Sequence, residues 1–237
     1  MIDDKQQIIN FDQRLNFEND NFFISKSNRH ILNLFDNWPN WEKNFLNISG
    51  EKFSGKTHLI NIFLKKFKGI QFEKEDFTNE NLKSIKDHKN IILENLDNNV
   101  DEKLFFALLN IIDQDNKFLI VTTKKPIVNL KFELTDLNSR LNNFLLFNIE
   151  KPDDDLVFAL VIKNLSDRQI SLDNKLLNYI TKRIDRSYDK IFDFIYKIDK
   201  NFVYYNLTFN GTATVFLKVM SSHNYNFDTQ NKLWILK

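Results

Sequence analysis

The sequence predicts an α/β fold in which a five-stranded parallel sheet is flanked by helices and followed by a small helical domain. Three observations predict it. Short apolar stretches alternate with stretches of helical periodicity up to Pro152, as in sheets that helices cover on both faces. After Pro152 the periodicity is mostly helical. Two of the chain's four glycines, Gly50 and Gly55, lie between one strand and the helix that follows it.

Five apolar stretches have the length of buried strands. They cover residues 45–49, 69–72, 90–94, 118–123 and 144–149. Apolar residues at helical spacing predict helices among these strands at 27–35, 57–67 and 101–112. The same spacing predicts helices after the strands at 156–165, 174–184, 188–198 and 212–221. The alternation before residue 152 therefore favours a parallel sheet between two layers of helices.

The window between the first strand and its helix fits the phosphate-binding pattern G-x-x-x-x-G-K-[ST]. It consists of Gly50-Glu51-Lys52-Phe53-Ser54-Gly55-Lys56-Thr57. The two glycines let the backbone approach a polyphosphate, Lys56 supplies a positive charge, and Thr57 offers a hydroxyl to Mg²⁺. The start of the helix adds a favourable partial charge for the phosphates.

This window predicts that the chain binds a nucleotide, either ADP or ATP, with Mg²⁺. Ser54 and His58 belong to the same segment and are predicted contacts of the nucleotide, although His58 also fits as an ordinary residue of the helix. A chance match in a surface turn is the alternative reading. The preceding strand and the following helix argue against it, because the motif requires that context.

Glu94 closes the strand at 90–94, where an acidic residue can hold Mg²⁺ through water. A solvated strand end is the alternative. The next residue is Asn95, and an amide cannot act as the general base that a carboxylate at this position would provide. Asp97 is the nearest substitute, although its position two residues further on should direct it elsewhere. Thr122 and Thr123 end the strand at 118–123, where they could sense a terminal phosphate or simply reflect the strand propensity of threonine.

Composition excludes several classes of function. The 237 residues carry a formal net charge of +1, so no global field indicates a nucleic-acid partner. The absence of cysteine excludes disulfides, thiolate metal sites and thiol nucleophiles. No apolar signal-peptide core follows Met1, and no apolar run is long enough to span a bilayer. We therefore expect a cytoplasmic protein with no membrane partner.

The order of these motifs resembles the AAA+ ATPases, and within them the bacterial replication initiator DnaA and its shorter Hda-type regulators. The resemblance rests on the phosphate-binding loop, the strand ending at Glu94, the two threonines, and the segments 136–141 and 185–187. It extends over nearly the whole chain. It implies an AAA+ P-loop NTPase fold with three parts: an N-terminal tail at 1–20, a nucleotide-binding domain at 21–151 and a helical lid domain at 152–237.

The resemblance also implies roles for single residues. Arg140 matches the arginine finger that reaches a nucleotide on a neighbouring subunit, and Arg186 matches the second sensor in the lid. Thr123 or Thr122 falls at the first sensor, and we take Thr123, with Glu94 and Arg140, as the catalytic set. Ile24 lies in the segment 22–28, which resembles the lining of the adenine pocket.

The N-terminal tail contains Gln7-Ile8-Ile9-Asn10-Phe11. This segment looks like the motif by which Hda proteins bind the DNA polymerase sliding clamp: Gln7, Ile8 and Phe11 fit, whereas Asn10 replaces the usual apolar residue. Short motifs also recur by chance. The clamp-binding interpretation is favoured by the position of the segment, which precedes an Hda-like sequence.

The resemblance predicts a regulator of chromosomal replication initiation that binds the sliding clamp and promotes ATP hydrolysis on DnaA. The residues 209–237 contain few basic side chains, so we expect no direct sequence-specific DNA binding of the DnaA type. Because Asn95 is not an acid, we expect weak ATPase activity at most. Two alternatives remain: an autonomous ATPase that acts as a loader or remodeller in DNA replication, and a module that has lost nucleotide. A homodimer is also left open.

Overall fold

The computed structural model describes residues 22–167, 174–205, 225–228 and 233–236. Its centre is a five-stranded parallel sheet with the strand order β2-β3-β4-β1-β5. This confirms the predicted sheet. The strands are β1 (Phe45–Ser49), β2 (Ile70–Glu73), β3 (Asn90–Leu96), β4 (Phe118–Thr123) and β5 (Leu145–Asn148).

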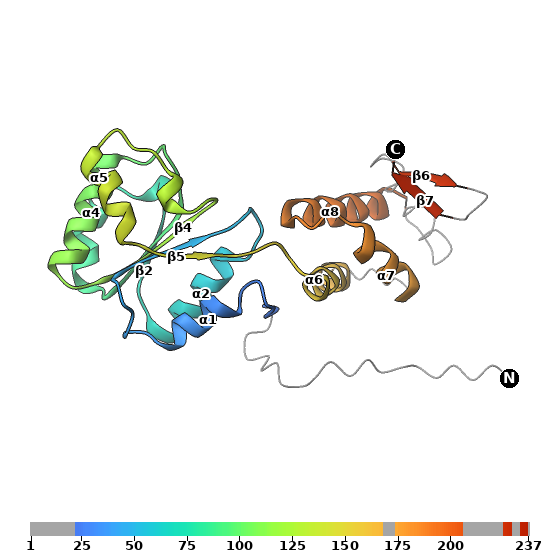
Figure 1. Ribbon diagram of the computed structural model, residues 1–237, viewed down its shortest axis with the longest axis horizontal. Helices are drawn as coiled ribbons and strands as arrows, with labels where there is room; N and C mark the ends of the chain where they lie inside the picture. Colours follow the sequence, from blue (N-terminus) through green and yellow to red (C-terminus); the bar gives the residue numbers. More distant parts are fainter. Residues whose placement is uncertain (1–21, 168–173, 206–224, 229–232, 237) are drawn as a thin grey trace.

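Helices cover both faces of the sheet, with α1 and α2 on one side and α4 and α5 on the other (Figure 1). Alternate residues of β3 pack against different layers of helices, because neighbouring strand residues point to opposite faces of the sheet. Ile92 packs in the core cluster of α2, whereas Ile91 and Leu93 pack in the core cluster of α4. The helices are α1 (Arg29–Asp36), α2 (Lys56–Phe67), α4 (Glu102–Gln114) and α5 (Thr135–Arg140), and the short α3 (Asn81–Ser84) precedes β3.

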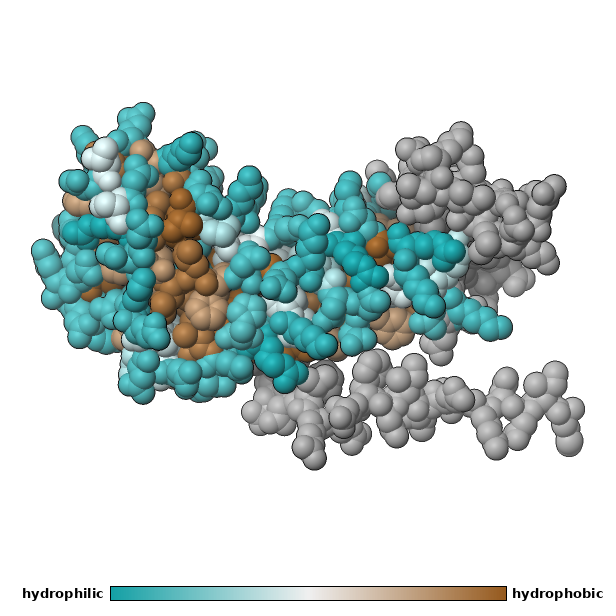
Figure 2. Space-filling model, viewed as in Figure 1, coloured by the Kyte–Doolittle hydropathy of each residue, from teal (hydrophilic) through white to brown (hydrophobic). Residues whose placement is uncertain are grey.

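Short 3₁₀ turns complete the connections between strands and helices. They are η1 (Lys74–Asp76), η2 (Ile85–Asp87), η3 (Ile127–Asn129) and η4 (Leu141–Asn143). One edge of the sheet is β5, which pairs only with β1 among the described strands, and the other edge is β2. Apolar side chains gather over this edge on the face seen in Figure 2, and Leu146 of β5 is 46% exposed.

The remaining described helices form a second core. They are α6 (Asp154–Asp167), α7 (Asn174–Arg183) and α8 (Tyr188–Tyr205). Val161, Ile180 and Ile191, one from each helix, are buried together. Tyr188 at the start of α8 packs instead with the α2 side of the sheet, and its hydroxyl donates to the Glu150 carbonyl at 3.1 Å. No helix in the described part of the chain is long and apolar enough to cross a membrane.

The C-terminal region contains two strands that the sequence analysis did not predict. β6 (Tyr225–Asp228) and β7 (Leu233–Leu236) pair antiparallel. Runs of four residues are too short for periodicity to separate strand from helix, which explains the omission. The predicted helix at 212–221 and the N-terminal tail at 1–20 lie outside the described residues. The division of the chain at residue 151 stays a prediction.

Candidate nucleotide-binding site

The phosphate-binding loop begins at the carboxyl end of β1 and ends at the first turn of α2. Because β1 lies between β4 and β5, the loop starts where the strand order reverses, which is where open α/β sheets bind ligands. The Gly50 N–H donates to the Thr123 carbonyl at 3.1 Å and thereby ties the start of the loop to the end of β4. The loop therefore has a fixed origin at the carboxyl edge of the sheet.

Both glycines of the motif are required by the local geometry. Gly55 has a φ of +91°, a backbone conformation that residues with a Cβ rarely adopt. A Cβ at Gly55 would lie 3.1 Å from a ring carbon of Phe22. A Cβ at Gly50 would lie 2.7 Å from the Ser54 Oγ, closer than real Cβ atoms approach a neighbour. The space beside the loop backbone thus exists only with glycine at these two positions.

Two polar groups in the loop indicate that a phosphate fits it. The Lys56 ammonium is almost buried and donates to the carbonyls of Gly50 and Glu51, each at 2.8 Å. Burial lowers the pKa of Lys56, and the nearby Glu94 carboxylate opposes this effect. The Ser54 Oγ is buried and has no hydrogen-bond partner among the described residues. A buried hydroxyl without a partner costs free energy, and a phosphate oxygen would satisfy it.

The end of β3 brings together the two predicted magnesium ligands. The Thr57 hydroxyl donates to the Glu94 Oε2 at 2.6 Å, and the Gln71 amide from β2 donates to the Glu94 Oε1. Glu94 is fully buried, and burial raises its pKa despite these hydrogen bonds. A hydroxyl and a carboxylate are hard oxygen donors that suit Mg²⁺, which keeps several waters. A bound Mg²⁺ would neutralise charge on the outer phosphates.

The two threonines at the end of β4 are buried, but their hydroxyls face different neighbours. The Thr123 hydroxyl accepts from the Asn47 amide at 2.9 Å and donates to the Lys125 carbonyl at 2.6 Å. The Thr122 hydroxyl accepts from the Asn95 N–H at 2.9 Å and thus lies next to the end of β3. The sensor role of Thr123 stays a prediction, and Thr122 is the threonine in contact with the Glu94-Asn95 segment.

The predicted adenine segment lies against the loop. The Phe22 ring stacks on the His58 ring, with their centroids 4.9 Å apart. Burial lowers the pKa of His58, and the nearby positive charges Lys163 and Lys65 lower it further, which favours a neutral ring. The Asn28 amide donates to the Phe23 carbonyl at 3.0 Å and fastens the segment. Ile24 is half-buried there, and its contact with adenine stays a prediction.

The predicted second sensor, Arg186, pairs with Asp154 at the start of α6. The residues that follow it contact the phosphate-binding loop. The Glu51 Oε2 accepts from the Ser187 hydroxyl at 3.0 Å and from the Tyr188 N–H at 3.2 Å. One turn further along α8, the Phe192 ring stacks on Phe53 with centroids 4.6 Å apart. We call this set the loop–lid contact: Glu51, Phe53, Ser187, Tyr188 and Phe192.

The sequence analysis missed the loop–lid contact because Glu51 and Phe53 occupy unconstrained positions of the motif. The structure itself shows one sign that this part of the loop is constrained. Phe53 has a φ of +63°, and such a conformation is rare for a bulky residue. Phe53 is also 46% exposed although it stacks on Phe192. The loop therefore holds an unfavourable backbone conformation in contact with α8.

Replacing Glu51 by alanine is expected to loosen the start of α8. The carboxylate satisfies an N–H group at a helix start, and loss of such an acceptor costs about 1 kcal/mol. Hydrogen–deuterium exchange should show faster exchange at the Tyr188 amide, with the central strands unchanged. Glu150→Ala is the matched control, because Glu150 contributes only its backbone to the described hydrogen bonds. Unchanged exchange at Tyr188 in the Glu51 variant would contradict the role of the carboxylate.

The predicted arginine finger, Arg140, ends α5 on the face of the sheet opposite to α2 (Figure 1). Its guanidinium pairs with Asp113 of α4 at 3.0 Å and lies over the Phe106 ring, 5.0 Å from the centroid. The side chain is still 31% exposed. Arg140 is thus fixed in direction by α4 and makes no described contact with the phosphate-binding loop of its own chain.

No protein-family model matches the sequence. The structure is similar to domain III of the replication initiation protein DnaA from Thermotoga maritima, with a TM-score of 0.63, 17% sequence identity and coverage of 83% of this chain and 93% of that chain. For AMPPCP-bound DnaA from Aquifex aeolicus the TM-score is 0.60 and the identity 19%, with coverage of 85% and 70%. For a RuvB mutant from Thermotoga maritima the TM-score is 0.64 and the identity 13%, with coverage of 86% and 71%. These similarities establish that the chain has the AAA+ P-loop NTPase fold.

Proposed function

We propose that the chain is an Hda-like regulator of replication initiation in the cytoplasm, which binds ADP or ATP with Mg²⁺, docks on the sliding clamp and promotes ATP hydrolysis on DnaA. One observation carries the proposal. The chain combines a phosphate cradle that has an amide, Asn95, in place of the usual second acid with a partly exposed arginine, Arg140, on the opposite face of the sheet. Asn95 limits hydrolysis of ATP bound to this chain. Arg140 can reach a nucleotide bound to another protein.

The nucleotide part of the proposal rests on the loop. Lys56 and Thr57 both interact with Glu94, and the same loop holds the unpaired Ser54 hydroxyl. The similar DnaA from Aquifex aeolicus was solved with AMPPCP. Both ATP and ADP suit this cradle, because the backbone N–H groups of such a loop contact the α- and β-phosphates that both nucleotides carry. A nucleotide held here would also lie beside α8, since Glu51 of the same loop bonds to Ser187 and Tyr188.

The clamp part of the proposal rests on Gln7, Ile8 and Phe11, which lie outside the described residues. Its test is direct binding of the full chain to the purified sliding clamp, measured by surface plasmon resonance. The double variant Gln7→Ala/Phe11→Ala should bind about 30-fold more weakly, as expected when anchor residues of an interface are lost. Gln6→Ala is the matched control and should bind as the wild type does. Equal binding by the double variant would remove the clamp from the proposal.

The similarity of fold to RuvB, of which one solved structure is described as a Holliday junction branch migration motor, favours a second candidate. In that case the chain is an autonomous ATPase that acts as a loader or remodeller. The two candidates differ in steady-state turnover: the isolated chain should hydrolyse ATP continuously as a motor, but only slowly as a regulator. Fast turnover without DnaA would favour the second candidate.

A further inference from the structure

Position 95 lacks a carboxylate, but the adjacent strand β2 carries one nearby, Glu73. In the parallel register of β2 and β3, Glu73 stands beside Glu94. Paired residues of neighbouring strands point to the same face of a sheet. Glu94 bonds to Thr57 at the start of α2, so Glu73 also lies on the face that carries the phosphate-binding loop. Gln71, two residues earlier on β2, follows the same rule and bonds to Glu94.

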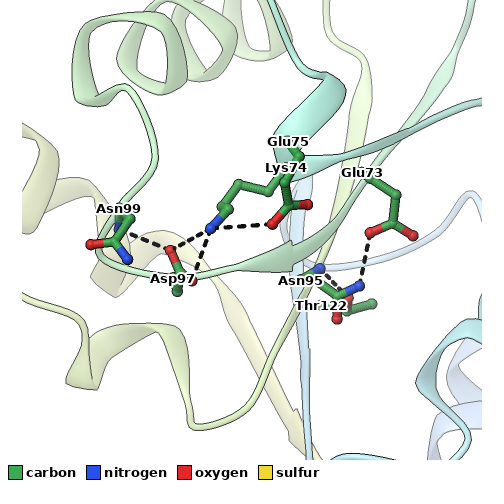
Figure 3. Close-up of polar contacts among 7 residues, drawn as sticks. All are labelled: Glu73, Lys74, Glu75, Asn95, Asp97, Asn99 and Thr122. Atoms are coloured by element: carbon green, nitrogen blue, oxygen red, sulfur yellow. Dashed lines mark hydrogen bonds and ion pairs between the residues drawn. The ribbon is translucent and has the colours of Figure 1, made fainter.

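Asn95 holds Glu73 in place. Its amide donates to the Glu73 Oε2 at 2.8 Å, and its backbone N–H donates to the Thr122 hydroxyl at 2.9 Å (Figure 3). The register of β3 and β4 is irregular between Leu93 and Leu96, and Asn95 has a φ of +58°. This bulge directs the Asn95 side chain sideways to β2. An amide at position 95 therefore orients a carboxylate that another strand supplies.

Asp97, the other carboxylate near this strand end, is engaged elsewhere. Both of its oxygens accept from the Lys74 ammonium, at 2.9 and 3.0 Å, and one also accepts from the Asn99 N–H at 2.8 Å. In Figure 3 its side chain points to Lys74 and Asn99 and away from Asn95. Glu73 is half-buried, and its side chain makes no hydrogen bond among the described residues besides the one from Asn95. Its second oxygen remains available.

From this arrangement we infer that Glu73 is the catalytic base for slow ATP hydrolysis by this chain, and that Asn95 positions it. The inference rests on the proposed binding of ATP at the same site. Glu73 accepts a proton from a water molecule while the water oxygen bonds to the terminal phosphorus. The bond from that phosphorus to the bridging oxygen breaks, and ADP departs with the electron pair. The protonated Glu73 then returns its proton to solvent, which leaves ADP and phosphate as products.

The test uses the full chain with Mg²⁺ and ATP, with hydrolysis followed in a single turnover and ATP affinity measured separately by calorimetry. Glu73→Gln should lower the rate about 100-fold, the lower range for loss of a general base, and leave the affinity within about threefold. Glu75→Gln is the matched control, because among the described residues the Glu75 side chain pairs only with Lys74. The exchange Glu73→Asn/Asn95→Glu keeps one carboxylate and one amide and should be at least about tenfold faster than Glu73→Gln.

Several results would overturn the inference. They are a Glu73→Gln rate equal to that of the wild type, equal losses of rate and affinity, and an Asp97→Asn variant that loses hydrolysis while Glu73→Gln retains it. An exchange variant that binds ATP but is as slow as Glu73→Gln would contradict the inferred pairing of positions 73 and 95 as one amide and one catalytic carboxylate. A wild-type chain that binds ATP without turnover would overturn this inference alone, whereas failure to bind ATP would overturn the proposed function as well.

Discussion

If the chain acts on DnaA as proposed, replacement of Arg140 by alanine is expected to lower the stimulation of ATP hydrolysis on DnaA by about 1000-fold, the lower range for loss of an arginine finger. The guanidinium would stabilise charge that develops on the transferred phosphoryl group of the partner's nucleotide. Its direction is already set in the isolated chain by the ion pair with Asp113 and by the Phe106 ring beneath it. Little ordering of the side chain is then needed when the partner binds.

The measurement is the rate of hydrolysis of DnaA-bound ATP in the presence of the chain and of sliding clamp loaded on DNA. Arg140→Lys should recover only a small part of the loss, because lysine keeps the charge without the planar fork of donors. Arg29→Ala on the exposed start of α1 is the matched control. Full stimulation by Arg140→Ala, with clamp binding intact, would reject the proposed regulatory mechanism.

Replacement of Lys56 by alanine is expected to weaken binding of ADP and of ATP by about 10- to 150-fold. The loss follows from the removal of a charge-assisted hydrogen bond, worth about 1.5–3 kcal/mol, and of a buried cation that faces the phosphates. Isothermal titration calorimetry with ADP and with ATP measures it. Lys103→Ala on the exposed face of α4 is the control for the loss of one lysine.

The folded state of the Lys56 variant needs its own check, because the ammonium also bonds to the carbonyls of Gly50 and Glu51. Circular dichroism and thermal unfolding should show a small loss of stability with the same secondary structure. Unchanged nucleotide affinity in a folded Lys56 variant would reject the loop as the binding site. Any steady ATP turnover by the wild-type chain should disappear in the same variant.

Local patterns were sufficient to predict the sheet and the loop. The five strands lie within two residues of the predicted ranges at either end. The central strands are short apolar runs that helices bury on both faces, which makes their ranges easy to predict. The pairing of Thr57 with Glu94 could also be predicted, since a strand end next to a phosphate-binding loop leaves few other positions for a magnesium ligand. These predictions depend on neighbours in sequence or on a motif with fixed spacing.

The contacts that could not be predicted depend on register and on packing between distant segments. Glu73 and Asn95 meet only because β2 and β3 pair in one register and β3 carries a bulge. Glu51 meets Ser187 only after α6, α7 and α8 have packed together, 136 residues along the chain. A single sequence gives no signal for either pairing, because both positions tolerate many residue types in the local pattern.

The loop–lid contact connects one residue, Glu51, both to the phosphate-binding loop and to the start of α8. The Glu51 carbonyl accepts from the Lys56 ammonium, and the Glu51 carboxylate accepts from the start of α8. A phosphate that binds to the Lys56 ammonium would compete with the Glu51 carbonyl. The backbone of Glu51 would then shift, and its side chain is the acceptor for the start of α8. Linkage is reciprocal: if nucleotide shifts the orientation of α8, a partner that fixes α8 shifts nucleotide affinity by the same factor. If a partner of the proposed function binds α8, Glu51 would thereby couple that binding to the affinity of the chain for nucleotide.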